Sequence, residues 1–259
     1  MNIVVLMKQV PDTYAERKLQ AADNTLDRDA SDAVINEIDE YAIEEGLLLK
    51  EAHGGEVTIL TMGPDRATES LRKALSMGAD KAVHVLDDAL HGSCAITTAK
   101  VLAKALATIE YDLVIAGSEA TDSRLSVIPA LVAEALGTAQ LSGARKVTVE
   151  GSTVTIERAT DTGFDRIQGT SPAVVSVVEK INEPRYPSFK GIMAAKSKPV
   201  TTLTLADLGI AADEVGLAAS TTTVESFEEA PPRAAGTVVK DEGAGGSAIA
   251  EYLANKKLI

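Results

Sequence analysis

Short, continuous apolar runs alternate with longer segments of helical periodicity along the first 140 residues. Mostly apolar runs of this length, of which residues 3–7 are continuous, are typical of parallel strands that are buried on both faces. The predicted strands are residues 3–7, 57–62, 82–86 and 113–117. Between them, apolar residues recur three or four positions apart, which predicts amphipathic helices.

Capping residues indicate where these helices begin and end. One helix is predicted at residues 36–53 and another at 67–77, each followed by glycine. We expect Ser93 to cap a third helix and Pro129 to lie near the start of a fourth. The expected inner face of the third helix consists of Ile96, Ala99, Ala103 and Leu106. Repeated strand–helix units predict the α/β class, with a doubly wound, mostly parallel, Rossmann-like sheet and helices on both faces.

The pattern changes in the second half of the chain. Residues 146–149 and 153–156 alternate between apolar and polar positions around a Glu-Gly-Ser turn, which predicts a β-hairpin. Another β-rich run covers residues 173–178. We therefore expect residues 1–181 to form one α/β domain with a β-hairpin addition.

Apolar periodicity fades in residues 182–259, which we interpret as a loop followed by an extended C-terminal arm with a short helix at 247–255. The arm is either disordered or ordered around a partner. The second interpretation is favoured because a disordered arm has no need of apolar side chains. Those side chains are Ile192, Met193, Leu203, Leu205 and Leu208.

Composition narrows the functional classes. Acidic residues outnumber basic ones 38 to 25, giving a net charge of -13, which disfavours binding to a phosphate backbone. Cys94 is the single cysteine and cannot form an internal disulfide, which fits a reducing compartment. No apolar run approaches the roughly 18 residues of a membrane span, so we expect a cytoplasmic protein without membrane insertion. The three histidines are scattered, and no metal site is expected.

No familiar catalytic motif is present. The chain lacks a G-x-x-x-x-G-K-[ST] loop, a G-x-G-x-x-G turn after a strand and a G-x-S-x-G elbow. We therefore expect no catalytic residues and no enzymatic activity of its own.

Ligands of open α/β sheets bind beyond the carboxyl ends of the strands. Residues 7–9, 62–64 and 117–123 follow three predicted strands, and the last stretch leads into a helix. Backbone N–H groups at that helix start could hold a phosphate, with hydroxyls from Ser123 and Ser126. The alternative is a capped connection without a ligand.

Residues 182–198 form a basic segment in an acidic chain. They hold one acid, Glu183, against four bases, and Phe189 lies among them. An exposed aromatic flanked by bases is typical of an anchor for a partner protein. The alternative is that Phe189 folds back into the core.

Several stretches of the sequence resemble those of a known family. The matching stretches are residues 7–10, 72–80 and 172–177, followed by Asn182-Glu183-Pro184-Arg185-Tyr186 and residues 192–196. They resemble the beta subunits of electron transfer flavoproteins, of the FixA type, over nearly the whole chain.

The resemblance implies an adenine-nucleotide-binding fold and a heterodimer with a larger alpha subunit. That subunit would hold most of an FAD, and residues 182–259 would recognise partners and wrap it. The heterodimer would take electrons from donor dehydrogenases, such as acyl-CoA dehydrogenases, and pass them to a membrane quinone oxidoreductase. An AMP would be bound structurally in this chain.

The resemblance also implies site residues. The AMP would contact Leu6, Asn36, Glu37, Ile38, Asp39, Met62, Gly117, Thr121, Asp122, Ser123, Arg124 and Ser126. Thr13 and Ile38 would approach the flavin. Partner contacts would come from Arg185, Tyr186, Phe189, Lys190, Ile192 and Met193.

Two alternatives stay open. The run Arg124–Pro129 departs from the glycines or glutamine common in the family, and some relatives hold a second FAD where AMP otherwise lies. The doubly wound pattern alone also fits a self-standing adenine-nucleotide-binding regulatory module of the stress-protein type.

Overall fold

The computed structural model describes residues 1–232, 236, 238 and 240–259. Its contacts divide the chain into two compact units, Met1–Glu225 and Ser226–Ile259. The second unit contains one helix, α6 (Gly245–Asn255), with no buried residue. The other described helices and strands all belong to the first unit.

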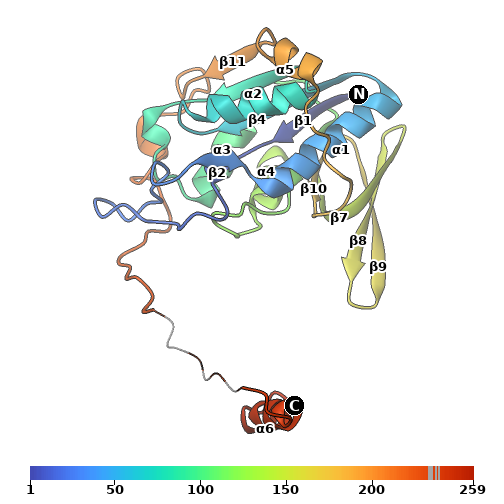
Figure 1. Ribbon diagram of the computed structural model, residues 1–259. Helices are drawn as coiled ribbons and strands as arrows, with labels where there is room; N and C mark the ends of the chain where they lie inside the picture. The colour runs from blue at the N-terminus through green and yellow to red at the C-terminus, as the bar shows by residue number, and fades with distance from the viewer. Residues whose placement is uncertain (233–235, 237, 239) are drawn as a thin grey trace. The chain divides into compact units, whose positions relative to one another are not determined.

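A nine-stranded sheet runs through the first unit in the order β11-β5-β4-β1-β6-β10-β7-β8-β9 (Figure 1). Neighbouring strands are parallel from β11 to β7, and β7, β8 and β9 pair antiparallel. The strands are β1 (Asn2–Leu6), β4 (Glu56–Met62), β5 (Lys81–Val85), β6 (Leu113–Gly117), β7 (Ala139–Glu150), β8 (Thr153–Thr160), β9 (Gly163–Thr170), β10 (Ala173–Val177) and β11 (Val200–Leu203). A separate antiparallel pair consists of β2 (Gln9–Pro11) and β3 (Ala33–Ile35).

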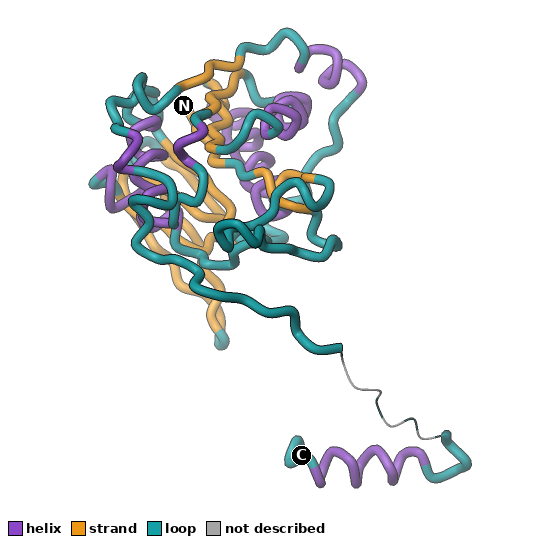
Figure 2. The backbone as a smooth tube through the Cα atoms, turned by 90° about the vertical axis from the view of Figure 1, so that its left-hand side faces the viewer, coloured by secondary structure: helices purple, strands orange, loops and turns teal. Residues whose placement is uncertain are grey.

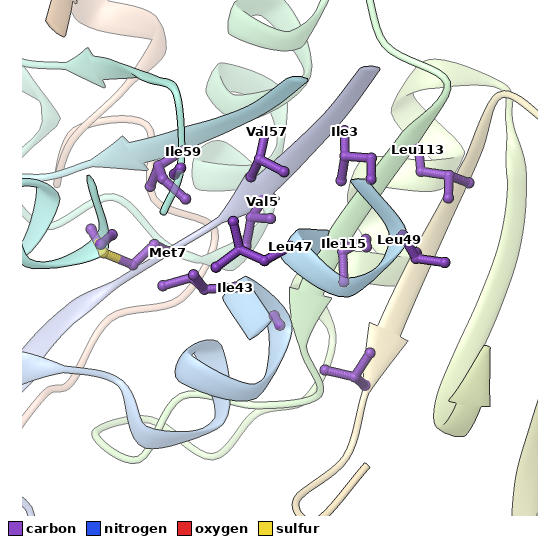
Figure 3. Packing of buried hydrophobic residues seen from close by; sticks show 14 of the residues in the cluster. Ile3, Val5, Met7, Ile43, Leu47, Leu49, Val57, Ile59, Leu113 and Ile115 are labelled. Atoms are coloured by element: carbon purple, nitrogen blue, oxygen red, sulfur yellow. The ribbon is translucent and has the colours of Figure 1, made fainter. Parts of the chain in front are cut away.

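Helices cover both faces of the parallel strands (Figure 2). They are α1 (Glu37–His53), α2 (Ala67–Met77), α3 (Ala95–Leu106), α4 (Ile128–Leu136) and the short α5 (Phe189–Ala195). Alternate residues of β1 enter different core layers: Ile3 and Val5 join the layer with α1 and α2, whereas Val4 and Leu6 join the layer with α3 and α4. Figure 3 shows the first layer, with Ile43 and Leu47 of α1 beside Val5. The predicted doubly wound α/β fold is confirmed.

Most predicted elements lie within one residue of their expected bounds. The runs at 3–7, 57–62, 82–86 and 113–117 correspond to β1, β4, β5 and β6, and residues 173–178 correspond to β10. The hairpin is confirmed as β7 and β8. A further strand, β9, pairs with β8. It was not predicted because most of its side chains are exposed and few are apolar.

Two details of α3 were predicted wrongly. Cys94, not Ser93, occupies the N-cap position, and no side chain caps the helix. The Ser93 hydroxyl instead donates a hydrogen bond to the Leu90 carbonyl oxygen at 2.7 Å. Ile96 is 44% exposed, whereas Val101 and Leu102 are buried, so the inner face of the helix is turned away from Ile96.

The first part of the expected arm packs within the first unit. β11 pairs with β5, and Leu205 and Leu208 are buried in the core layer of α3 and α4. The contacts thus divide the chain after Glu225, about forty residues beyond the expected boundary at 181/182. Wrapping of a partner by residues 182–259 stays a prediction, and residues 233–235, 237 and 239 of that range lie outside the described residues.

Candidate functional site

Strand order reverses at β1, because β4 and β5 lie on one side of it and β6 on the other. At such a reversal, the helices that follow the two strands cover opposite faces of the sheet, and a crevice opens beyond the carboxyl ends. The ends here are Lys8, just after β1, and Gly117, the last residue of β6. Residues 118–127 continue from Gly117 and lead into α4.

Asp39, in the first turn of α1, joins the two strand ends. Its carboxylate accepts hydrogen bonds from the Lys8 backbone N–H at 2.8 Å and from the Gly117 backbone N–H at 3.2 Å. A Cβ atom at position 117 would lie 2.4 Å from the Asp39 Oδ1 atom, so glycine is required for this approach. Burial raises the pKa of Asp39 from 3.8 to about 7, although the backbone donors favour its charged form.

Asn36, the residue before α1, ties the crevice to the loop after β6. Its side-chain Nδ2 donates to the Glu119 carbonyl oxygen at 2.8 Å, and its Oδ1 accepts from the Thr121 backbone N–H at 3.0 Å. Asn36 is 1% exposed. Its amide therefore fixes the loop and leaves no side-chain cap for α1.

A buried carboxylate between two bases forms the polar centre of the crevice. The Asp122 side chain is 2% exposed, and its carboxylate lies 2.9 Å from the Lys8 Nζ atom and 3.7 Å from the Arg28 Nη2 atom. Partial burial lowers the pKa of Lys8, and the Asp122 carboxylate opposes that change. Asp122 thus positions two cations at the crevice, and the Asp39 carboxylate also attracts Lys8.

Two hydrogen-bond donors in residues 118–127 are already bonded to the Glu119 carboxylate. The Glu119 carboxylate accepts from the Arg124 guanidinium at 3.0 Å and from the Ser126 hydroxyl at 3.0 Å. Arg124 and Ser126 both have positive φ, 48° and 57°. An incoming phosphate would compete with Glu119 for these two donors.

Other donors at the crevice are available. Within the described residues no side chain caps α4; Pro129 has no N–H group, so Ile128 and Ala130 supply the N–H groups of the first turn that could face an anion. The Thr121 side chain is buried, and its hydroxyl has no hydrogen-bond partner among the described residues. Donors of this kind could bind a phosphate-bearing ligand.

The remaining expected nucleotide residues differ in exposure. Leu6 and Ile38 are buried, Met62 is half-buried at the end of β4, and Glu37 and Ser123 are exposed. The Thr13 hydroxyl, expected near the flavin, is buried and has no partner in the described chain. The structure thus gathers the strand-end residues at one edge of the sheet, and Glu37 faces solvent beside them.

A second region with functional features is the basic segment of residues 182–198. Arg185 donates from Nε and Nη2 to the Glu44 carboxylate at 2.8 and 2.9 Å, and from Nη1 to Glu51 at 2.6 Å. Asn182 Nδ2 donates to the Glu45 carboxylate at 3.0 Å. The bonds to Glu44 and Glu51 raise the pKa of Arg185, and together with the Asn182 bond they attach the start of the segment to α1.

The end of the segment is attached to α2. Arg72 Nη1 donates to the carbonyl oxygens of Ala195 at 2.8 Å and of Lys198 at 2.9 Å. Lys198 Nζ donates to the carbonyl oxygens of Leu75 and Ala79 at 2.9 and 2.6 Å, satisfying the C-terminal end of α2. The segment is therefore held at both ends.

Large apolar side chains are exposed between these attachments. Tyr186 is 95% exposed and Phe189 is 81% exposed, so Phe189 does not fold back into the core. Ile192 and Met193 of α5 are about half exposed, and Lys190 is also exposed. We call Tyr186, Phe189, Ile192 and Met193 the α5 surface.

Comparisons with known proteins show which family this chain is similar to. The model of the electron transfer flavoprotein domain matches residues 23–208. The electron transfer flavoprotein subunit beta of Mycobacterium tuberculosis is 57% identical over an alignment of 264 residues, which covers the whole chain and 99% of the relative. The protein of the same name from Thermoanaerobacterium thermosaccharolyticum is 40% identical over 225 residues, 86% of each chain.

The chain belongs to the electron transfer flavoprotein family.

For this member of the family, sequence reasoning missed several residues that build the two regions. Arg28 lies in a polar loop with no periodic signal, and Glu119 lies in the predicted strand-end stretch without a predicted role. Glu44 and Glu45 are buried acids on α1, a position that a charged residue seldom occupies unless it is paired. An acidic residue on the inner face of a predicted helix was therefore the signal that could have indicated an ion pair such as that of Glu44 with Arg185.

The described residues include neither a metal-binding group nor a membrane-spanning helix. No group of histidine, cysteine and acidic side chains among them is arranged to hold a metal ion. None of the helices described is long and apolar enough to cross a membrane.

Proposed function

We propose that the chain is the beta subunit of a heterodimeric electron transfer flavoprotein and has no catalytic residues of its own. It carries electrons in the cytoplasm, from donor dehydrogenases such as acyl-CoA dehydrogenases to a membrane quinone oxidoreductase. The observation that carries the proposal is the α5 surface, because exposed aromatics attached at both ends are suited to docking. The whole-chain similarity to proteins named as beta subunits supports it.

We propose that AMP binds at the crevice and has a structural role. The open N-terminus of α4 and the unpaired Thr121 hydroxyl supply donors, and Lys8 and Arg28 supply positive charge. Ser123, Arg124 and Ser126 would hold the phosphate once Glu119 releases the last two of them. Leu6, Ile38 and Met62 offer apolar contact for the base, while Asn36, Asp39 and Gly117 fix the crevice.

An FAD held mainly by the alpha subunit supplies the redox chemistry when it is bound. The role proposed for this chain is to cover one side of the flavin and limit access of water. Thr13 and Ile38 are placed nearest to it in the proposal, and the unpaired Thr13 hydroxyl offers a hydrogen bond. Residues 226–259 would extend along the alpha subunit, because α6 has no buried residue in its own unit.

Co-expression with the genes that neighbour this one tests the proposal. Native mass spectrometry should detect a one-to-one heterodimer, and the purified complex should be yellow. A colourless chain that stays monomeric, and that binds an adenine nucleotide after removal of residues 226–259, would favour the self-standing regulatory module instead.

A further inference from the structure

The loop from β6 to α4 contains an exposed part, residues 123–126. Arg124 and Ser126 within it have positive φ, a conformation that residues with a Cβ atom seldom adopt unless neighbouring contacts hold it. The Glu119 carboxylate accepts a hydrogen bond from each of these side chains, through a different oxygen. The Glu119 carbonyl oxygen is in turn fixed by Asn36. One carboxylate at the fixed start of the loop therefore closes its exposed part.

The crevice carries no excess of positive charge for a phosphate. Its bases are Lys8, Arg28 and Arg124, its bonded acids are Asp39, Asp122 and Glu119, and Glu37 is an exposed acid beside them. Each of the three bases has a carboxylate oxygen within 3.7 Å. A phosphate therefore gains a favourable electrostatic field only if one of the bonded acids moves away.

Of the three bonded acids, Glu119 is the one that can move at low cost. Asp39 is buried and accepts backbone N–H groups at the ends of β1 and β6, so it holds the crevice together. The Asp122 side chain is 2% exposed and lies between two cations. The Glu119 side chain is 24% exposed, and both its partners belong to the exposed part of the loop. Its carboxylate can turn toward water while its carbonyl oxygen stays bonded to Asn36.

We propose that the Glu119 carboxylate is an internal competitor for the nucleotide phosphate: it binds Arg124 and Ser126 while the crevice is empty and releases them when a phosphate arrives. The proposal rests on the proposed AMP site and deepens it by naming the residue that controls occupancy. A phosphomonoester carries about two negative charges at pH 7 and has three acceptor oxygens, so it displaces a carboxylate that carries one charge. The buried Thr121 hydroxyl, without a partner among the described residues, is a further donor that Glu119 leaves unused.

This competition has two consequences. A nucleotide with a phosphate loses part of its binding free energy to the displacement of Glu119, whereas adenosine leaves Glu119 in place. The loop also stays closed in the empty crevice, because Arg124 and Ser126 always have an acceptor. Glu119 thus weakens phosphate binding and makes the nucleotide exchangeable.

Removing the charge of Glu119 tests the competition. Exchange of bound AMP for isotope-labelled AMP, followed by native mass spectrometry of the heterodimer, measures the rate of release. Glu119→Gln keeps the size of the side chain and should slow release about tenfold. The matched control is Glu40→Gln on α1, whose side chain is 28% exposed and paired with Lys73, and which should change release less than about twofold. Equal rates in the two variants, or faster release from Glu119→Gln, would overturn the proposal.

Arg124 should carry most of this effect. Arg124→Ala should speed AMP release several-fold, and in that background Glu119→Gln should slow release less than about threefold. A full tenfold effect without Arg124 would contradict the competition. The affinity of adenosine, measured by its competition with labelled AMP, should differ less than about twofold between wild type and Glu119→Gln. A tenfold gain for adenosine would show that the substitution alters the whole crevice, and would overturn the proposal.

The wild-type heterodimer provides a test that needs no variant. The methyl ester of AMP has one negative charge on its phosphate, no more than the carboxylate that it must displace. It should bind at least about tenfold more weakly than AMP, and equal affinities would contradict displacement.

Failure of the proposed function would be seen differently. A wild-type heterodimer that lacks flavin, or that binds no adenosine phosphate, would contradict the proposed function itself. A yellow wild type that exchanges AMP, with the same rate in Glu119→Gln, would overturn only the role of Glu119.

Discussion

Glu44 and Arg185 form a two-pronged ion pair that joins α1 to a segment 141 residues away in the sequence. The Arg185 backbone N–H also donates to the same carboxylate, at 3.1 Å. The Glu44 side chain is 6% exposed, so it depends on Arg185 to offset its desolvation. This pair sets the position from which Tyr186 and Phe189 project.

Removal of Arg185 should destabilise the first unit. Arg185→Ala leaves a buried carboxylate without a partner, so the free energy of unfolding should fall on the order of 3 kcal/mol. Urea denaturation followed by circular dichroism measures it. The control is Arg166→Ala, whose guanidinium is 70% exposed and 3.6 Å from Glu157, with an expected loss below about 0.5 kcal/mol. Equal losses would show that the Glu44 pair is no stronger than a surface contact.

One methyl group added at Gly191 should disturb the packing of α5 on α2. Gly191→Ala should cost about 1–3 kcal/mol, because the new Cβ atom meets the Ser76 carbonyl oxygen and backbone must shift. Gly163→Ala on β9 is the control, since nothing lies within 4 Å of its added Cβ. Hydrogen exchange should show faster opening of α5 in Gly191→Ala alone. Unchanged exchange in that variant would contradict the close packing of α5.

The pH dependence of stability should carry a contribution from Asp39. Its pKa in the folded chain, about 7, lies above the ordinary 3.8, so folding favours the protonated form. The stability from this group is complete below pH 3.8 and is lost as pH rises through about 7, with an upper bound of about 4 kcal/mol.

Asp39→Asn removes the titrating group and should flatten this part of the profile. Urea denaturation from pH 4 to pH 8 measures the difference in slope between wild type and variant. A constant offset from the lost backbone hydrogen bond is expected and does not enter the comparison. Parallel profiles would mean that the backbone donors keep Asp39 ionised.

Much of this fold could be predicted from the pattern of apolar residues. β1, β4, β5 and β6 are buried on both faces along most of their length, so each appears as a mostly apolar run. β9 and α5 gave no such signal, because most of their residues are exposed. Their conformation is set by pairing with β8 and by contact with α2, which a single sequence does not display.

The candidate site was predictable in position but not in its bonding. The strand ends follow from the fold class, and Asn36, Asp39 and Gly117 were expected there. The hydrogen bonds from Gly117 to Asp39 and from Thr121 to Asn36 join residues about eighty positions apart, and no local spacing encodes such contacts. The same holds for the pairing of Arg185 with Glu44 and Glu51. The expected contact of Arg185 with a partner stays a prediction.

Loss of the Phe189 side chain should affect docking and leave stability unchanged. Phe189 is 81% exposed, so Phe189→Ala should alter the free energy of unfolding by less than about 0.5 kcal/mol. Electron transfer from a donor dehydrogenase should slow by about tenfold. Phe164→Ala on β9 is the control, since it removes a ring that stacks on Arg145 and should leave transfer intact. A large loss of melting temperature in Phe189→Ala would assign Phe189 to packing.

The nucleotide content of the purified complex tests the central claim most directly. Denaturation of the complex of this chain with its co-expressed alpha subunit, followed by mass spectrometry of the supernatant, should release one FAD and one AMP per heterodimer. A second FAD in place of AMP would contradict the assignment of the crevice. A chain that purifies alone and releases neither flavin nor adenosine phosphate would contradict the function as a whole.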